Sequence, residues 1–416
     1  MEPEKKEQIK ISGLAGLNDA IIDLGRFNLF IGPQASGKSV AAKVLYFLKS
    51  FCDTAIESIA GGLTYEVFLE ERIRQFDRYF PPAFRSANGF RVEYVLNRNG
   101  IIIDGGKNVA VVIDSPAWKH LYNEVAEQCN RAQNGLLRNS LTPKLAMSIR
   151  YQVVFGVPMP TPQIFIPDGR SDYLRFVEKV TLIQQSQYVQ DLIDPFMADF
   201  LSVYTWARDS LGKALSDWTE VFDLDSITSI FRGRPVEKDG ETHILMDDGR
   251  LVPLSFASSG QKEMIPVFKM LAFLLVTAKS STGHQVFPLY IEEPETHLFP
   301  ESQVKASEEI TKKFNQVLLS QIVVTTHSPY VATALNNLLY AGQLGKSSSG
   351  REYVKEIMPE PYWLNSEEFS AFRFDGGCVQ DAIDPETGLI QADIIDSASN
   401  EIGGVFDRLL ELDDRE

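Results

Sequence analysis

The chain has 416 residues, of which 44% are hydrophobic, 11% aromatic and 23% charged. This composition is typical of a globular protein with one large core or two linked ones, and it excludes disorder, collagen and a coiled-coil rod as descriptions of the whole. Forty basic residues against 56 acidic ones give a net charge of −16, which disfavours nucleic acid and anionic lipid as partners unless a local basic patch offsets it.

Two further features indicate the compartment. The N-terminus lacks the apolar segment of a signal peptide, and the longest apolar run, residues 270–278, is too short to span a bilayer. The cysteines are odd in number and far apart, which favours a reducing compartment and excludes a disulfide framework and a clustered-thiolate zinc site: they are Cys52, Cys129 and Cys378. We therefore expect a soluble, cytoplasmic protein with no membrane partner.

The first half of the chain is predicted to begin with strands and to continue with helices. Short apolar runs separated by glycine-bearing turns indicate three strands, at 8–14, 19–24 and 27–31. The third strand leads into a glycine-rich loop and a helix. Residues 89–113 alternate apolar and polar residues across Asn-Gly and Gly-Gly turns, which is typical of a β-meander. Residues 116–230 are predicted as a helical insertion with one apolar strand near 163–171.

The second half returns to strands and turns from about residue 231. Apolar strands then alternate with helices, at 260–279 (helix), 286–293 (strand), 301–315 (helix), 321–328 (strand) and from Pro329 (helix). Continuous apolar strands between helices predict a parallel sheet covered by helices. An exposed loop is expected at 344–352 and a helix at the C-terminus. The predicted fold class is α/β, with a parallel or mixed sheet, an antiparallel β subdomain and the helical insertion, in four parts: 1–115, 116–230, 231–345 and 346–416.

The strongest motif is a phosphate-binding loop between the third strand and its helix. It consists of Gly32, Pro33, Gln34, Ala35, Ser36, Gly37, Lys38 and Ser39, and Val40 follows in the helix. The two glycines allow backbone N–H groups to converge on a phosphate, and the helix N-terminus faces the same anion. Lys38 is predicted to reach the β- and γ-phosphates of ATP, and the Ser39 hydroxyl to bind Mg²⁺.

Three weaker signals occur in the second half of the chain. The strand at 286–293 delivers Glu292 and Glu293 to its carboxyl end, where Glu292 would hold Mg²⁺ and Glu293 would orient or deprotonate the attacking water. His327, after the next strand, could sense the γ-phosphate. The helix start at Ser258, Ser259 and Gly260 could bind an anion. Taken singly, these features are more often a solvated acidic turn, a structural histidine and a helix N-cap.

The order of these motifs resembles that of ABC-type ATPases of the SMC, RecF and OLD kind. The segments SSGQKE, EEPETHLFP and TTHSPY are most similar to bacterial AAA-labelled ATPases related to OLD proteins, many of which belong to phage-defence operons. The segment 165–171 resembles their Pro-Ala-x-Arg-Ser element, and the tail resembles their closing segment. The stretch from 116 to 230 matches nothing else.

This resemblance implies a mechanism. Two copies would form a head-to-tail homodimer or higher homo-oligomer, in which Ser258, Ser259 and Gly260 of one copy cap the ATP held by the other. The segment 294–297 would cross the dimer interface. Loss of the γ-phosphate would release the dimer, so ATP would act as a clamp on a separate effector such as a nuclease or toxin. The setting implied is anti-phage defence.

The sequence also departs from the resemblance. The metal-side acid is Glu292 where Asp is usual, and Ser259 stands where the transporter form has a second glycine. Gln152 and Gln163 are both candidates for the lobe-linking glutamine, with a structural role favoured for each. Arg170 is either a phosphate-sensing or a bracing arginine. The tail is too short for a TOPRIM nuclease domain, and its scattered acids fit solvated surface, so no nuclease activity is expected: they are Asp375, Asp381, Asp384 and Asp396.

Two rival functions are also compatible with the sequence. The first is a DNA-repair or chromosome-maintenance ATPase of the RecF or SMC type. A basic-aromatic patch would serve it, made of Arg72, Arg74, Arg78, Arg85, Tyr79, Phe80 and Phe84, although an amphipathic helix with a solvated face is the simpler interpretation of that stretch. The second is the nucleotide-binding subunit of a membrane transporter, which the long insertion and the form of the signature disfavour.

Overall fold

The centre of the fold is a six-stranded sheet. The computed structural model describes residues 7–97, 99–107, 112–133, 143–160, 163–171, 193–214, 218–238, 241–280, 287–316 and 321–391. The strand order is β14-β13-β3-β12-β11-β7, in which all neighbours are parallel except the edge strand β14. The strands are β3 (Phe27–Ile31), β7 (Ile164–Ile166), β11 (Pro288–Glu292), β12 (Gln321–Thr326), β13 (Phe369–Asp375) and β14 (Cys378–Asp381).

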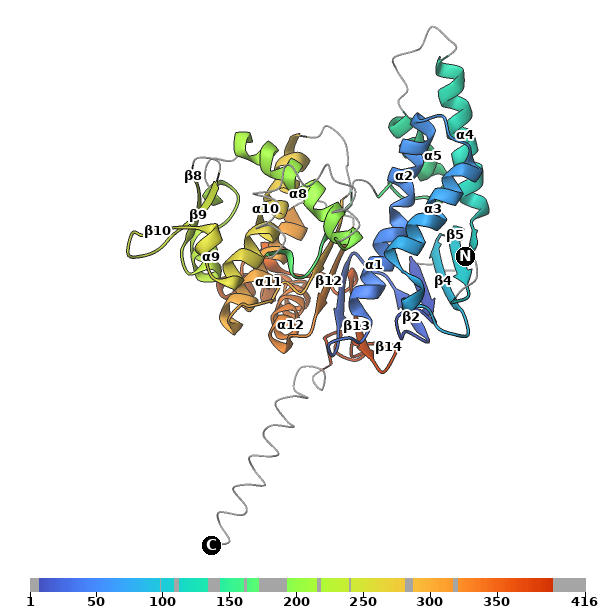
Figure 1. Cartoon of the computed structure of the whole chain (residues 1–416). Helices are drawn as coiled ribbons and strands as arrows, with labels where there is room; N and C mark the ends of the chain where they lie inside the picture. Colours follow the sequence, from blue (N-terminus) through green and yellow to red (C-terminus); the bar gives the residue numbers. More distant parts are fainter. Residues whose placement is uncertain are drawn as a thin grey trace.

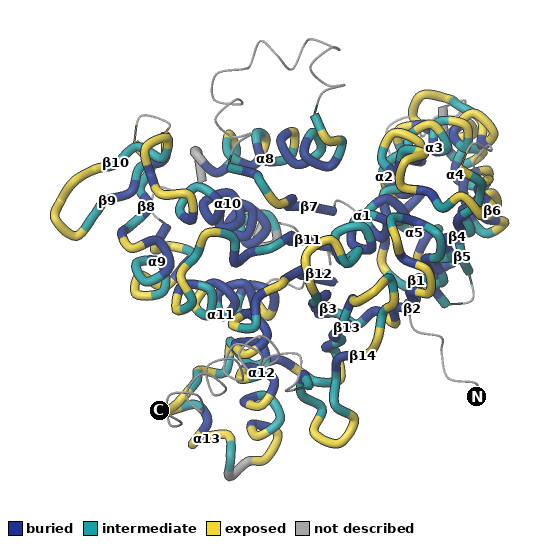
Figure 2. The backbone as a smooth tube through the Cα atoms, turned by 60° about the horizontal axis from the view of Figure 1, so that its bottom comes forward, coloured by how far each residue is buried: buried dark blue, intermediate teal, exposed yellow. Residues whose placement is uncertain are grey.

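The strands of this sheet are apolar throughout because both of their faces are buried. Side chains alternate between the faces along a strand, so Leu289 and Ile291 lie in one hydrophobic core and Tyr290 lies in the other. The same alternation places Leu29 in the first core and Phe30 in the second. Figure 2 shows the strands as the buried centre of the molecule. The predicted parallel, helix-covered sheet is confirmed.

The N-terminal lobe forms the second of these cores. Its antiparallel sheet has the order β2-β1-β4-β5-β6, and helices α1 to α5 share its hydrophobic core (Figure 1). The strands are β1 (Gln8–Ser12), β2 (Ala20–Asp23), β4 (Phe90–Leu96), β5 (Asn99–Gly105) and β6 (Val112–Asp114). The helices are α1 (Lys38–Lys49), α2 (Phe51–Ala60), α3 (Tyr65–Tyr79), α4 (Pro116–Gln133) and α5 (Pro143–Phe155). The predicted N-terminal strands and β-meander are therefore confirmed.

The first core lies on the other face of the central sheet, against helices α8 to α12 (Figure 1). These helices are α8 (Pro195–Ala214), α9 (Leu224–Phe231), α10 (Ser259–Ser280), α11 (Pro300–Gln316) and α12 (Pro329–Leu344). An antiparallel sheet of order β10-β9-β8 adjoins them, built from β8 (Arg234–Lys238), β9 (Glu241–Leu245) and β10 (Leu251–Pro253). Short 3-10 turns occur at Pro82–Phe84, Trp218–Glu220, Leu254–Phe256 and Glu360–Tyr362.

The fold class is the predicted α/β architecture with a mixed central sheet and antiparallel sheets. Residues 116–230 are divided between the two cores, since α4 and α5 lie in the N-terminal one and α8 and α9 in the other. Strand β7 joins the central sheet. In the described part of the chain, every helix is too short or too polar to cross a bilayer.

The prediction of an exposed loop at 344–352 is wrong, because most of these residues belong to helix α13 (Ser348–Ile357). Ser347 caps this helix by accepting a hydrogen bond from the Gly350 N–H, so the serine-rich run begins a helix. Arg351 also pairs with Glu360 beyond the helix end. The helix expected at the C-terminus lies outside the described residues.

Candidate functional site

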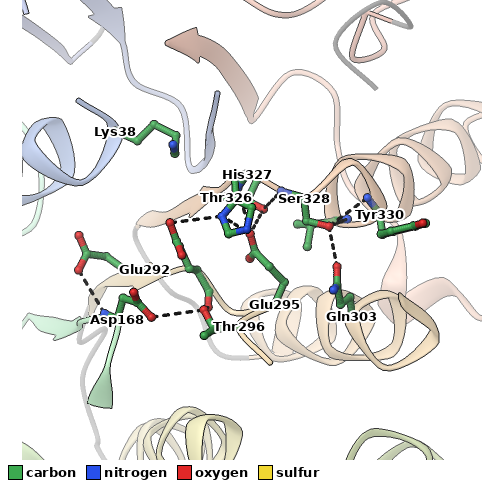
Figure 3. Close-up of polar contacts among 12 residues, drawn as sticks. Lys38, Asp168, Glu292, Glu295, Thr296, Gln303, Thr326, His327, Ser328 and Tyr330 are labelled. Atoms are coloured by element: carbon green, nitrogen blue, oxygen red, sulfur yellow. Dashed lines mark hydrogen bonds and ion pairs between the residues drawn. The ribbon is translucent and has the colours of Figure 1, made fainter. Parts of the chain in front are cut away.

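The predicted site residues meet at one edge of the central sheet. Strands β3, β12, β11 and β7 are parallel neighbours, so their carboxyl ends share this edge. The residues at or just after those ends include Lys38, His327, the Glu292–Glu293 pair and Asp168. Figure 3 shows the Lys38 side chain near Glu292, Glu295 and His327.

The phosphate-binding loop connects β3 to α1. Its last glycine, Gly37, has a φ of 100°, and a Cβ there would lie 2.6 Å from the Leu17 side chain, so only glycine fits. Lys38 is 4% exposed, and its Nζ donates hydrogen bonds to the carbonyls of Gly32 (2.8 Å) and Pro33 (2.6 Å). Burial lowers the pKa of Lys38, and the charges of Glu293 and Glu295 oppose that shift.

The remaining loop positions differ in exposure. Pro33, Gln34 and Ala35 are exposed, and Ser36 is half-buried with its hydroxyl 3.4 Å from Lys38 Nζ. The side chain of Val40 packs against the N-terminal core, so Val40 offers a nucleotide no more than its backbone.

Glu292 and Ser39 form a pair suited to a hard cation. The Ser39 side chain lies close enough to the Glu292 carboxylate to lower its pKa, and Glu292 Oε2 accepts from the Asp168 N–H at 3.2 Å. Glu292 Oε1 is buried without a hydrogen-bond partner. Burial raises the pKa of Glu292. An orphaned buried oxygen beside a hydroxyl is a donor set that fits Mg²⁺, although the described residues contain no cluster of three or more His, Cys, Asp or Glu ligands.

Glu293 and His327 form a second pair beside the first. Glu293 Oε1 lies 3.4 Å from His327 Nδ1. The hydrogen bond to His327 lowers the pKa of Glu293 and raises that of His327, so the pair favours a carboxylate and an imidazolium. Glu293 has a φ of 42°, which is a strained backbone for glutamate. Such strain often occurs at functional positions.

Glu295 holds the histidine loop in place. It is 3% exposed, and its Oε1 accepts from the Thr326 hydroxyl (2.5 Å) and from the His327 N–H (3.0 Å). Ser328 caps α12 by accepting from the Tyr330 and Val331 N–H groups, and its hydroxyl donates to Gln303 at 2.6 Å. The position of His327 is therefore determined from both sides.

The serine-glycine turn begins helix α10. Ser258 accepts from the Gln261 N–H and donates its own N–H to the Gln261 side chain, which is a reciprocal N-cap. A Cβ on Gly260 would lie 2.6 Å from the His297 carbonyl, so this turn rests on the segment that follows β11. Ser258 and Ser259 are exposed.

Sequence reasoning missed Asp168 and left Arg170 open. Asp168 follows β7 at the same edge as Glu292, and its carboxylate accepts from Thr296 at 3.3 Å. Arg170 is fully buried, and its guanidinium donates to protein carbonyls, which is the geometry of a brace. Both residues follow an apolar strand, and this signal is present in the sequence. The sequence does not show that this strand lies beside the strand that ends in Glu292.

Several predicted groups are not brought to the site. The basic-aromatic patch is absent as one surface, because Arg72 and Arg85 are buried: Arg72 lies over the Phe47 ring, and Arg85 pairs with Asp77. Gln163 donates to the Tyr46 carbonyl, which is a structural role, and Gln152 is exposed on α5. The described tail acids Asp375, Asp381 and Asp384 pair with Arg373 or cap turns. Asp396 lies outside the described residues.

Comparison with known proteins identifies part of this arrangement. Residues 187–332 match the family model described as AAA ATPase domain, a range that includes the serine-glycine turn, Glu292, Glu293 and His327. The match supports an ATPase domain in this part of the chain. No curated protein matches the sequence.

Three solved structures are similar at low identity. An SMC head domain from Thermotoga maritima has 12% identity and a TM-score of 0.37, with 90% of this chain and 97% of that chain covered. An SmcHead bound to the C-winged helix domain of ScpA has 12% identity and a TM-score of 0.38 over 92% and 99%. The recombination mediator protein RecF has 11% identity and a TM-score of 0.31 over 91% and 99%. These TM-scores are too low to support conclusions about this chain.

Proposed function

We propose that the chain is an ABC-type ATPase that binds and hydrolyses ATP in the cytoplasm. The observation that carries this proposal is the meeting of a phosphate-binding loop, a serine-carboxylate pair and a carboxylate-histidine pair at one sheet edge. Phosphoryl transfer needs mainly positioning and charge stabilisation, and these groups supply both.

Each group has a distinct role in this proposal. Lys38 exchanges the loop carbonyls for the β- and γ-phosphates, and Ser39 and Glu292 would hold Mg²⁺. When bound, Mg²⁺ neutralises charge on the triphosphate. Glu293 orients or deprotonates the attacking water, and its lowered pKa keeps it ionised. His327 is a hydrogen-bond donor to the γ-phosphate.

The proposal includes a homodimer in which Ser258, Ser259 and Gly260 cap the ATP of a second copy. The exposure of both serines supports this arrangement. Two aromatic side chains beside the turn are also exposed, Phe256 at 81% and Phe299 at 67%, and large exposed apolar groups are typical of contact surfaces. We further propose, from the family resemblance, that the ATP-bound dimer controls a separate effector in anti-phage defence and that this chain is not itself a nuclease.

The alternative function, a DNA-regulated ATPase, has less support. The buried positions of Arg72 and Arg85 remove half of the arginines of the patch that would have served it. ATPase activity that is insensitive to added duplex DNA at low salt would agree with this conclusion, and strong stimulation that falls steeply with salt would favour the alternative.

Binding and assembly test the proposal directly. Lys38→Ala is expected to abolish ATP binding measured by calorimetry. Ser259→Arg changes an exposed residue of the turn and leaves the phosphate loop intact, so it is expected to bind ATP and to remain monomeric by light scattering. Gln152→Arg, on the exposed face of α5, is the matched control and should dimerise with ATP. A Ser259→Arg variant that dimerises like the wild type would refute the capping role.

A further inference from the structure

Arg170 is a buried arginine that hydrogen-bonds to the backbone of the site. It follows strand β7 and is 0% exposed. Its Nε donates to the Glu263 carbonyl at 2.8 Å and lies 3.4 Å from the Glu263 carboxylate. Its Nη1 donates to the carbonyls of Pro167 (2.8 Å) and Glu292 (2.9 Å), and its Nη2 donates to that of Glu293 (3.5 Å). One guanidinium therefore holds three elements together.

The elements that it joins belong to two different parts of the ATPase site. Glu263 lies on α10, three residues after Gly260, so it moves with the serine-glycine turn. Glu292 and Glu293 are the carboxylates at the end of β11. The Ser171 N–H also donates to the Glu263 carboxylate at 3.2 Å, which strengthens the same link.

The link affects the backbone where orientation matters most. Arg170 donates to the carbonyls of the two peptide groups that flank Glu293, those of Glu292 and of Glu293. Glu293 has the strained φ of 42°, and a strained residue keeps its conformation only when its surroundings hold it. A shift of α10 would therefore change the direction of the Glu293 side chain. Misplacement of a reacting group by about 1 Å costs on the order of 10²-fold in rate.

We infer that Arg170 is a positioning residue that couples the two ATP sites of the dimer. The inference rests on the proposed function, in which the serine-glycine turn touches ATP held by a second copy. Contact of that turn with the second copy's ATP fixes α10, and Arg170 passes this position to the carboxylates that act on the ATP of its own copy. Hydrolysis at either site then depends on occupancy of both.

The alternative is that Arg170 and Glu263 form a buried ion pair that only stabilises the fold. A second ion pair on helix α10 serves as the control. Lys269 of α10 pairs with Glu237 of β8 at 3.2 Å, with 9% and 25% of the two side chains exposed. Glu263→Gln and Glu237→Gln each weaken one ion pair of α10. Only the first pair reaches the site. Arg170→Lys keeps the charge and loses the forked donor geometry.

The test measures ATP affinity, kcat, the Hill coefficient for ATP and thermal stability for each variant. We expect Glu263→Gln and Arg170→Lys to bind ATP within about threefold of the wild type, to lose about 10-fold or more in kcat, and to show a Hill coefficient that falls to 1. Glu237→Gln should lose stability and keep both the kcat and the Hill coefficient.

Two results overturn the inference. One is an unchanged Hill coefficient and kcat in Arg170→Lys; the other is equal kinetic losses in Glu237→Gln and Glu263→Gln that follow their losses of stability. A wild-type chain that hydrolyses ATP as a dimer with a Hill coefficient of 1 would also overturn it, while leaving the proposed function standing. A wild-type chain that neither binds ATP nor dimerises would refute the proposed function itself.

Discussion

Replacement of Glu293 by glutamine is the sharpest test of the catalytic assignment. The variant keeps the size of the side chain and removes its ability to accept a proton. Glu293 lies 3.4 Å from His327 and is 19% exposed, so it is reachable by a water molecule beside the γ-phosphate. Its lowered pKa keeps the wild-type side chain ionised at neutral pH. The phosphate loop is untouched, so ATP affinity should be unchanged.

The size of the effect follows from the role. A positioned general base contributes about 10²–10⁴-fold to the rate, which corresponds to about 3–5 kcal/mol in the activation barrier at 1.4 kcal/mol per tenfold. A second effect is independent of catalysis. His327 loses the carboxylate that contributes most to its raised pKa, so its pKa should fall in Glu293→Gln, and its imidazolium should lose its proton at a lower pH than in the wild type.

Steady-state release of phosphate gives kcat, and calorimetry gives the ATP affinity. An NMR titration of the histidine ring protons gives the pKa of His327. Glu301→Gln is the control, since Glu301 is a surface carboxylate of α11 that is 71% exposed and pairs with Arg232. Hydrolysis by Glu293→Gln at the wild-type rate would show that the base lies elsewhere, and an unchanged His327 pKa would contradict the geometry of the pair.

Two further predictions concern the loop and the N-terminal lobe. Gly37→Ala places a Cβ against Leu17 at a φ of 100°, so ATP affinity should fall about 10-fold or more, whereas Gly62→Ala, at a φ of 72° with open space, should bind normally; equal binding by both variants would refute the steric argument. Burial raises the pKa of Asp53 from 3.8 to about 7. The Asp53 carboxyl therefore ionises at a lower pH in the unfolded chain than in the folded one, so stability falls as the pH rises between these two values. Asp53→Asn should therefore raise the free energy of unfolding at pH 8 by roughly 1–3 kcal/mol, seen as a higher melting temperature, and leave it unchanged at pH 4. A gain at both pH values would contradict this assignment.

The chemistry-bearing motifs could be predicted because each is local and each follows an apolar strand. Gly32 to Ser39 needs only a strand, a glycine loop and a helix in succession. Glu292 and His327 each follow a short continuous apolar run, and such runs are typical of parallel strands buried on both faces. Parallel strands place their carboxyl ends at one edge, so the motifs had to converge if the sheet formed.

Predictions that depended on whether a side chain is exposed to solvent were less accurate. Arg72 and Arg85 suggested a basic surface, but their stems and guanidinium groups lie among aromatic rings, and Arg72 contacts both Phe47 and Phe51. Composition cannot distinguish a solvated arginine from one that is buried against aromatic faces. The serine-rich run before Arg351 suggested a loop for a similar reason, because a serine cap and an exposed turn contain the same residue types.

The local pattern of residues was enough to specify the loop, the acids and the histidine, since their spacing along the chain is what the chemistry requires. Asp168 and the bracing role of Arg170 became apparent only when β7 was placed beside β11. The pairing of two strands more than a hundred residues apart depends on long-range packing of side chains, and no short stretch of sequence records it. The same packing ties α10 to the carboxylates through one buried guanidinium, and it is the reason that two distant motifs can act together.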